Sequence, residues 1–167
     1  MKMDFLSKSV LKISALTFAI AATASCTAMA TGTDHQTANA TSSTAITLGN
    51  AATTSGTNDT VAIGSQANAG LNSATAVGGQ ANAAGLGSTS IGWQSKATAE
   101  RAQAFGHLAN ASGVRSTAVG EAAMAGGNND TVAVGNKANA GLNSATAVGG
   151  EANAAGLGST SIGWQSK

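Results

Sequence analysis

The sequence predicts an all-β chain folded as a parallel β-solenoid of about nine coils. A β-compatible apolar residue followed by glycine recurs along most of the chain, at steps of 14 residues with two steps of 15. Proline is absent, and aromatic residues make up only 3% of the chain. A short, nearly fixed period is typical of stacked supersecondary units rather than of a globular core. A unit of this length has room for two short strands and two tight turns.

Nine apolar–glycine pairs mark the coils. The apolar members, which we expect to form the core of the repeat, are Leu48, Ile63, Val77, Ile91, Phe105, Val119, Val134, Val148 and Ile162. The turn glycines that follow them are Gly49, Gly64, Gly78, Gly92, Gly106, Gly120, Gly135, Gly149 and Gly163. Glycine accepts positive φ at little cost, so we expect each one to turn the chain from the first strand of its coil to the second.

Two short strands are expected in each coil. The three residues before the glycine, such as Thr117–Val119, alternate with a period of two and carry no charge on either face. We therefore expect both faces to be covered, one by the interior of the roll and the other by an identical neighbour, and the sequence leaves open which face is which. The second strand, such as Ala67–Ala69, alternates small residues with a polar one, as a half-exposed strand does.

The chain divides into three parts. A basic start, an apolar run and small residues ahead of the cut predict a secretory signal peptide over residues 1–30, cleaved after Ala30. Lipid attachment at Cys26 is the alternative to this cleavage. Residues 31–43 have no periodic apolar signal and are expected to form a flexible leader, and residues 44–167 carry the coils.

The sequence also contains a longer repeat, which is made up of several of the short ones. Residues 57–96 and 128–167 match at all but five positions. The second copy stops at Lys167 in the middle of a coil, so we expect this chain to be a truncated product of a longer gene.

The repeat is similar to one in a known family. Residues 59–70, Asp-Thr-Val-Ala-Ile-Gly-Ser-Gln-Ala-Asn-Ala-Gly, resemble the head repeat of trimeric autotransporter adhesins, the YadA-like family of Gram-negative bacteria. Residues 73–78 and 116–120 look like further copies, and the resemblance covers residues 44–167.

The resemblance implies a left-handed parallel β-roll, a homotrimer, and attachment to host cells or to a host matrix protein such as collagen. It also implies a virulence-associated protein exported to the cell surface or outer membrane, or secreted if the chain has no anchor.

Several function classes are disfavoured. After residue 30 the chain carries five basic and six acidic residues without a basic stripe or a lysine-rich amphipathic segment, so neither nucleic acid nor direct membrane contact is expected. No nucleophile–base pair is evident, and we expect neither an enzyme nor a cofactor. Gly85–Gly87 lacks the context of a phosphate loop. At Asp59 and Asp130, in the two longer coils, an Asx turn is preferred over a calcium site, so no metal is expected.

The expected partner-binding surface consists of Trp93, Trp164 and His107, each directly after a turn glycine. A tryptophan there either anchors a partner or covers the corner of a neighbouring chain. A passive structural spacer is the alternative function. An ice-binding solenoid is a further one, because five threonines share a column that is interrupted at three positions. These threonines are Thr75, Thr89, Thr117, Thr146 and Thr160.

Overall fold

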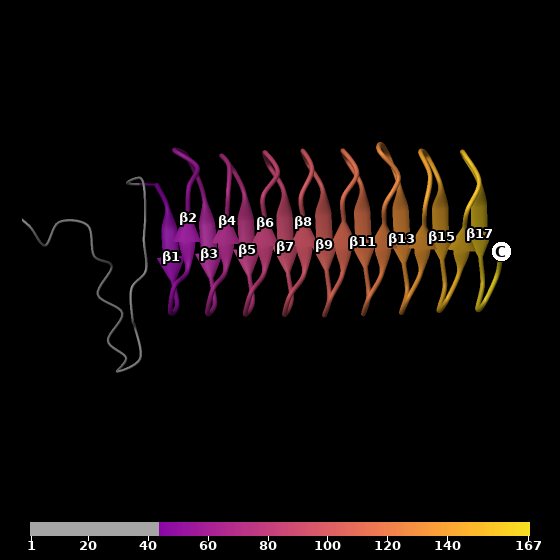
Figure 1. Ribbon diagram of the computed structural model, residues 1–167, viewed down its shortest axis with the longest axis horizontal. Helices are drawn as coiled ribbons and strands as arrows, with labels where there is room; N and C mark the ends of the chain where they lie inside the picture. Colours follow the sequence, from indigo (N-terminus) through magenta and orange to yellow (C-terminus); the bar gives the residue numbers. More distant parts are fainter. Residues whose placement is uncertain (1–43) are drawn as a thin grey trace, which may run out of the picture. The chain divides into compact units, whose positions relative to one another are not determined.

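The computed structural model describes residues 44–167, and these residues form a parallel β-solenoid without a helix. The coils follow one another in single file from β1 to β17, and each coil contacts only the coils before and after it (Figure 1). The predicted fold class, an all-β parallel roll, is confirmed. The expected signal peptide and leader lie outside the described residues.

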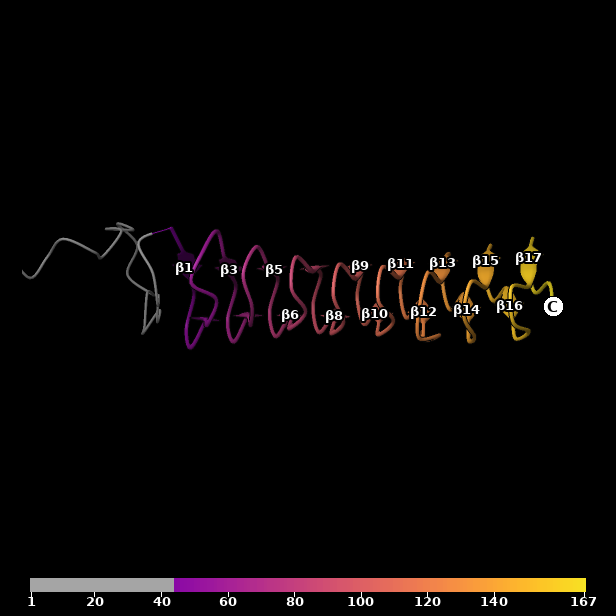
Figure 2. The same cartoon turned by 90° about the horizontal axis from the view of Figure 1, so that it is seen from above.

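Each of the first eight coils contributes one strand to each of two sheets, and the last described coil contributes β17 to the first sheet only. The first sheet consists of β1 (Ile46–Leu48), β3 (Val61–Ile63), β5 (Thr75–Val77), β7 (Thr89–Ile91), β9 (Gln103–Phe105), β11 (Thr117–Val119), β13 (Val132–Val134), β15 (Thr146–Val148) and β17 (Thr160–Ile162). The second sheet consists of β2 (Thr53–Thr54), β4 (Asn68–Ala69), β6 (Asn82–Ala83), β8 (Lys96–Ala97), β10 (Asn110–Ala111), β12 (Met124–Ala125), β14 (Asn139–Ala140) and β16 (Asn153–Ala154). The two sheets lie on opposite sides of the roll (Figure 2).

Equivalent residues of successive coils pair with one another. Val77 of β5 lies beside Ile91 of β7, and Ala76 lies beside Ser90. All strand pairs are parallel, and the same register continues through both sheets. Parallel neighbours lie about 4.8 Å apart, so each column of equivalent residues forms a ladder at that spacing.

The interior of the roll is built from alanine. The central residue of each first-sheet strand and the small residues of the second strand face inward, and Ala62, Ala67 and Ala69 of one coil are fully buried. Where serines replace the alanines they bond across the interior, as the hydroxyl oxygens of Ser90 and Ser95 do at 2.7 Å. The two sheets are therefore too close together for larger side chains to fit between them.

The apolar residues before the turn glycines do not form this interior, and our expectation that they do is wrong. In each three-residue strand only the central side chain points inward, so the residues on either side of it point outward. The apolar column therefore lies on the outside of the roll, and each of its members is at least partly exposed in the single chain. Its members are Leu48, Ile63, Val77, Ile91, Phe105, Val119, Val134, Val148 and Ile162. Ile91 keeps 39% of its surface exposed and Ile162 69%.

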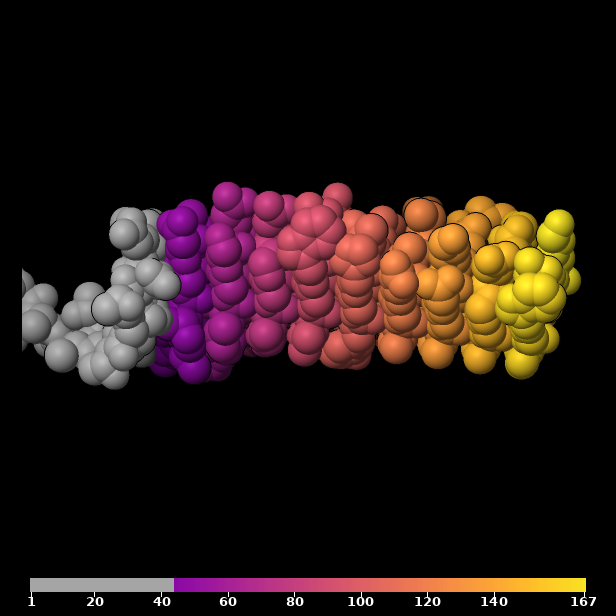
Figure 3. All heavy atoms as spheres, turned by 90° about the horizontal axis from the view of Figure 1, so that it is seen from below, coloured from indigo at the N-terminus to yellow at the C-terminus, as the bar shows by residue number. Residues whose placement is uncertain are grey.

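Each turn glycine adopts a backbone conformation that other residues rarely take. The φ angles of these nine glycines lie between 123° and 136°. The residue two positions later also has positive φ, as at Gln66 with 59°, and a bond from the Ala67 amide to the Gly64 carbonyl closes the turn at 3.2 Å. In the space-filling view, successive coils form parallel ridges that run across the roll (Figure 3).

The two longer coils accommodate their extra residue with an asparagine side chain. The amide of Thr57 donates to Asn72 Oδ1 at 2.7 Å, and the amide of Asn128 donates to Asn143 Oδ1 at the same distance. In both cases the asparagine belongs to the following coil. The extra residue is thus held by a neighbouring side chain, and the stacking of the strands continues undisturbed.

Candidate functional surface

A ladder of aromatic and charged side chains runs along the glycine corner of the central coils. Trp93 and His107 occupy the position directly after the turn glycine in adjacent coils, and their rings stack at a centroid distance of 5.0 Å with 19° between the planes. His107 Nδ1 lies 3.5 Å from Glu121 Oε1. The side-chain nitrogen Nδ2 of Asn136 donates to Glu121 Oε2 at 3.3 Å. The repeat brings these side chains into one column, with steps of 14 residues from Trp93 to Glu121 and a step of 15 from Glu121 to Asn136.

The indole of Trp93 packs between two neighbouring coils. A Cβ on Gly79 in the preceding coil would come within 3.1 Å of Trp93 Cδ1, so a larger residue there would require the ring to shift by a few tenths of an ångström. His107 stacks on a face of the ring from the following coil, and 50% of the Trp93 surface remains exposed.

The second tryptophan repeats part of this arrangement. A Cβ on Gly150 would lie 3.3 Å from Trp164 Cδ1, and Trp164 is 75% exposed. Trp164 belongs to the second copy of the long repeat, 71 residues after Trp93. The structure therefore brings Trp93 and His107 together and places Trp164 in the same column, five coils further along.

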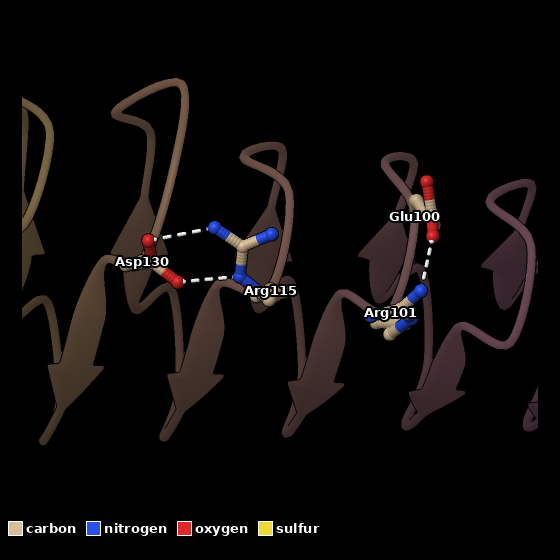
Figure 4. Close-up of polar contacts among 4 residues, drawn as sticks. All are labelled: Glu100, Arg101, Arg115 and Asp130. Carbon is tan, nitrogen blue, oxygen red and sulfur yellow. Dashed lines mark hydrogen bonds and ion pairs between the residues drawn. The ribbon is translucent and has the colours of Figure 1, made fainter.

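The opposite corner carries a cluster of charges. Arg115 donates from Nε and from an Nη to the two carboxylate oxygens of Asp130 at 2.7 and 2.8 Å, which joins adjacent coils (Figure 4). This hydrogen bonding lowers the pKa of Asp130 and raises the pKa of Arg115 relative to their ordinary values. Arg101 contacts Glu100 at 2.8 Å within one turn. Sequence reasoning did not identify the Arg115–Asp130 pair, although the two residues share a column.

Both aspartates of the longer coils lie in this corner. Asp130 is engaged by Arg115, and the backbone amide of Asp59 donates to Thr44 Oγ1 at 3.1 Å. Within residues 44–167 no group of three or more histidine, cysteine or acidic side chains is arranged to hold a metal ion. In that range no helix has the length and apolar character needed to cross a bilayer.

The outer face of the second sheet is polar apart from Met124. Thr53 donates to Asn68 Oδ1 at 3.0 Å, and Asn68 donates to Asn82 Oδ1 at 3.0 Å. Asn139 and Asn153 form a similar bond in the second copy. Because an amide has both a donor and an acceptor, such a ladder stabilises neighbouring coils while it faces water.

The outer face of the first sheet is different. We call it the first-sheet face and define it as the first and third residues of the nine strands of that sheet. Its third residues are the apolar column described above. Its first residues are Ile46, Val61, Thr75, Thr89, Gln103, Thr117, Val132, Thr146 and Thr160. The face carries no charge, and the five threonines considered for ice binding lie on it together with the apolar column.

One comparison with known proteins bears on this surface. The family model described as YadA head domain repeat (2 copies) matches residues 58–81, 72–95, 83–109, 97–123 and 143–166. These segments together cover more than half of the chain and lie entirely within the coils. A search of curated proteins gives no match.

Proposed function

Because this chain belongs to the family of YadA head repeats, adhesin-type surface proteins, we propose that residues 44–167 form the head of a homotrimeric adhesin that attaches to a host matrix protein such as collagen. The proposal places the head outside the cell, at the surface or outer membrane of a Gram-negative bacterium. It assigns no catalytic activity and no cofactor to the coils.

The first-sheet face is the observation that carries the proposal. It is an uncharged, largely apolar strip along the whole roll. Its side chains are partly exposed in the inner strands of the sheet, and Ile91 there keeps 39% of its surface exposed. The alanine interior buries little apolar area per coil, whereas each ordered residue costs about 1–2 kcal/mol of conformational entropy. Covering the first-sheet face with identical neighbours adds the missing apolar burial. We therefore assign the contact between chains to this face.

A substitution on this face tests the assembly. Val119 lies on the outer face of β11, so Val119→Asp would bury a carboxylate between chains and is expected to weaken association without changing the alanine interior of its coil. Sedimentation equilibrium of the exported chain should give a trimer. Val119→Asp should shift the population to a smaller species that loses its β-sheet circular dichroism at a lower temperature than the trimer does. A stable, well-folded monomer of the unsubstituted chain would contradict the proposed assembly.

With the first-sheet face covered, the glycine corner stays accessible and becomes the proposed ligand-binding surface. Trp93, His107 and Trp164 present aromatic rings there in a fixed geometry, and exposed aromatic side chains often dominate the energetics of protein interfaces. The long repeat shows this corner twice, so one ligand with repeated motifs, such as collagen, can engage it at two positions.

Binding to immobilised collagen, fibronectin and laminin tests the ligand. The double substitution Trp93→Ala with Trp164→Ala is expected to weaken binding at least ten-fold. Met124→Ala is the matched control, because Met124 is 47% exposed and lies on the outer face of the second sheet. Equal binding by both variants would show that the two tryptophans do not contribute to ligand binding.

The alternative functions make different predictions. A passive spacer binds none of the three matrix proteins. An ice-binding solenoid needs the threonines of the first-sheet face open to water, so it requires a monomer that shows thermal hysteresis. A trimer without thermal hysteresis would exclude ice binding through this face.

A further inference from the structure

We propose that Gln103 and Phe105, the two outward residues of β9, set the register in which copies of this chain associate. The inference rests on the proposed trimer and assigns a specific role within it to one of the nine strands of the first sheet.

Repetition makes the register of such an assembly ambiguous. Most coils present a threonine or valine together with a valine or isoleucine on the first-sheet face. A slip of one coil, about 4.8 Å, would place nearly the same side chains opposite each other and would lose the contacts of only one coil. Register is weakly specified wherever a strand pattern repeats in this way, so a unique trimer needs at least one layer that fits only itself.

A shift by the long repeat is a second source of ambiguity. The first-sheet strands β3, β5 and β7 match β13, β15 and β17 almost residue for residue. A slip of five coils would therefore bring one copy of the long repeat against the other. This slip leaves four of the nine described coils opposite a strand, so it loses far more contact than a slip of one coil, and it leaves β9 facing no strand of the neighbour.

Among the nine described strands of the first sheet, β9 is the exception. Its first residue is glutamine, where the other strands have threonine, valine or isoleucine, and its third residue is phenylalanine, where they have leucine, isoleucine or valine. Gln103 is exposed in the single chain and Phe105 is partly exposed. The strand is fifth in the sheet order and lies between the two copies of the long repeat. The atypical layer is thus at the centre of the roll, in a segment without a second copy.

In the aligned register the side chains of β9 satisfy one another. Closed symmetry brings each coil against the same coil of its neighbours. The Gln103 amides meet, and each can donate to and accept from the next because a carboxamide has both functions. The Phe105 rings meet one another in one layer. The layers on either side contain the smaller side chains of Ile91 and Val119.

A one-coil slip would break both arrangements. Gln103 would face Thr89 and Ile91, or Thr117 and Val119, of the neighbouring chain. Its amide would then be buried without a full set of partners, and an unpaired buried amide is unfavourable. Phe105 would be forced into a layer sized for valine or isoleucine, which overpacks it. A single buried polar residue fixes the register of coiled coils in the same way.

Disulfide cross-linking between two tagged populations tests the proposal on the exported chain, with Cys26→Ser removing the one natural cysteine. One population carries Thr75→Cys and the other Thr89→Cys, on the outer faces of adjacent coils. In the aligned register, cross-links between identical positions should exceed mixed ones at least ten-fold, because a disulfide requires its two Cβ atoms to lie within about 4.5 Å.

Replacing the β9 pair should remove this preference. Gln103→Thr with Phe105→Val copies the outward residues of β11, and mixed cross-links should then approach the same-position ones in yield. Val132→Thr is the control, because it also makes one strand resemble its neighbours but removes neither an amide nor an aromatic ring. It should leave the ten-fold preference unchanged.

Moving the pair to the next coil distinguishes a role in setting the register from a merely structural role of these two residues. In the chain with the β9 replacement, Thr117→Gln with Val119→Phe places the atypical layer on β11. When this shifted chain is mixed with a chain that keeps the original β9 pair, the two should associate with a register shift of one coil. The chain with the original pair carries Thr75→Cys and the shifted chain carries Thr89→Cys, and these two positions should become the preferred cross-link.

The outcomes separate the inference from the proposed function. A trimer in which the β9 replacement or the shifted pair leaves the cross-links unchanged overturns the register role and keeps the trimer. An unsubstituted chain that stays a folded monomer overturns the trimer and the register role together.

Discussion

Adding a single Cβ at a turn glycine should be among the most destabilising small changes in this protein. Gly106 has φ of 133°, and a Cβ built there would lie 2.6 Å from the carbonyl oxygen and 2.8 Å from the carbonyl carbon of Gly120 in the next coil. Both contacts are with backbone, so relief requires the stacked coils to move apart. Gly106→Ala therefore combines an unfavourable backbone conformation with overpacking.

The expected magnitude follows from these two terms. Holding a non-glycine residue in a sparsely populated φ/ψ region costs about 1–3 kcal/mol. Forcing extra atoms into a closely packed site costs about 1–3 kcal/mol more. We expect Gly106→Ala to lower the free energy of unfolding by about 4 kcal/mol, within a range of about 2–6 kcal/mol.

Gly141 provides the matched control. It lies at the opposite corner, its φ is not positive, and an added Cβ would have no atom within 4 Å. Gly141→Ala should change the free energy of unfolding by less than about 0.5 kcal/mol.

Urea unfolding followed by circular dichroism at equal protein concentration measures both variants, because association makes the midpoint depend on concentration. If Gly106→Ala and Gly141→Ala have the same midpoint, the close stacking of the glycine corners does not limit stability.

Further changes test other parts of the structure. Ala118→Leu should cost about 1–3 kcal/mol by urea unfolding, because the fully buried Ala118 lies between two closely spaced sheets. Thr131→Val should be neutral or stabilising in the same assay, because the buried hydroxyl of Thr131 has no hydrogen-bond partner. Arg115→Gln should lower the urea midpoint slightly at neutral pH, and this difference should shrink as the pH is lowered. The pKa of Asp130 is lowered in the folded state, so the contribution of the pair is present above the unfolded pKa and is lost as the pH falls through the folded one. Mass spectrometry of the exported protein should find the chain beginning directly after Ala30; a lipid-modified N-terminal cysteine would contradict this.

Much of the fold could be predicted from the sequence because the coil is a local unit. A strand of three residues, a turn glycine and a second short strand are all defined within 14 residues, and repetition shows which positions are equivalent. Equivalence also predicts contacts. Trp93 and His107 stack because both follow a turn glycine in adjacent coils, and the same period relates Trp164 to them.

The sequence by itself determined the period, the strands and the corners of this protein, because these depend on short-range alternation and on the backbone freedom of glycine. Only the tertiary structure decided which face of the first strand lies inside. Ala118 and Val119 alternate on an uncharged strand, so either face could fill the roll. The short connections hold the two sheets so close that only alanine and serine fit between them, which turns the larger apolar side chains outward. That distance between the sheets belongs to the closed coil as a whole, and no stretch of the sequence records it.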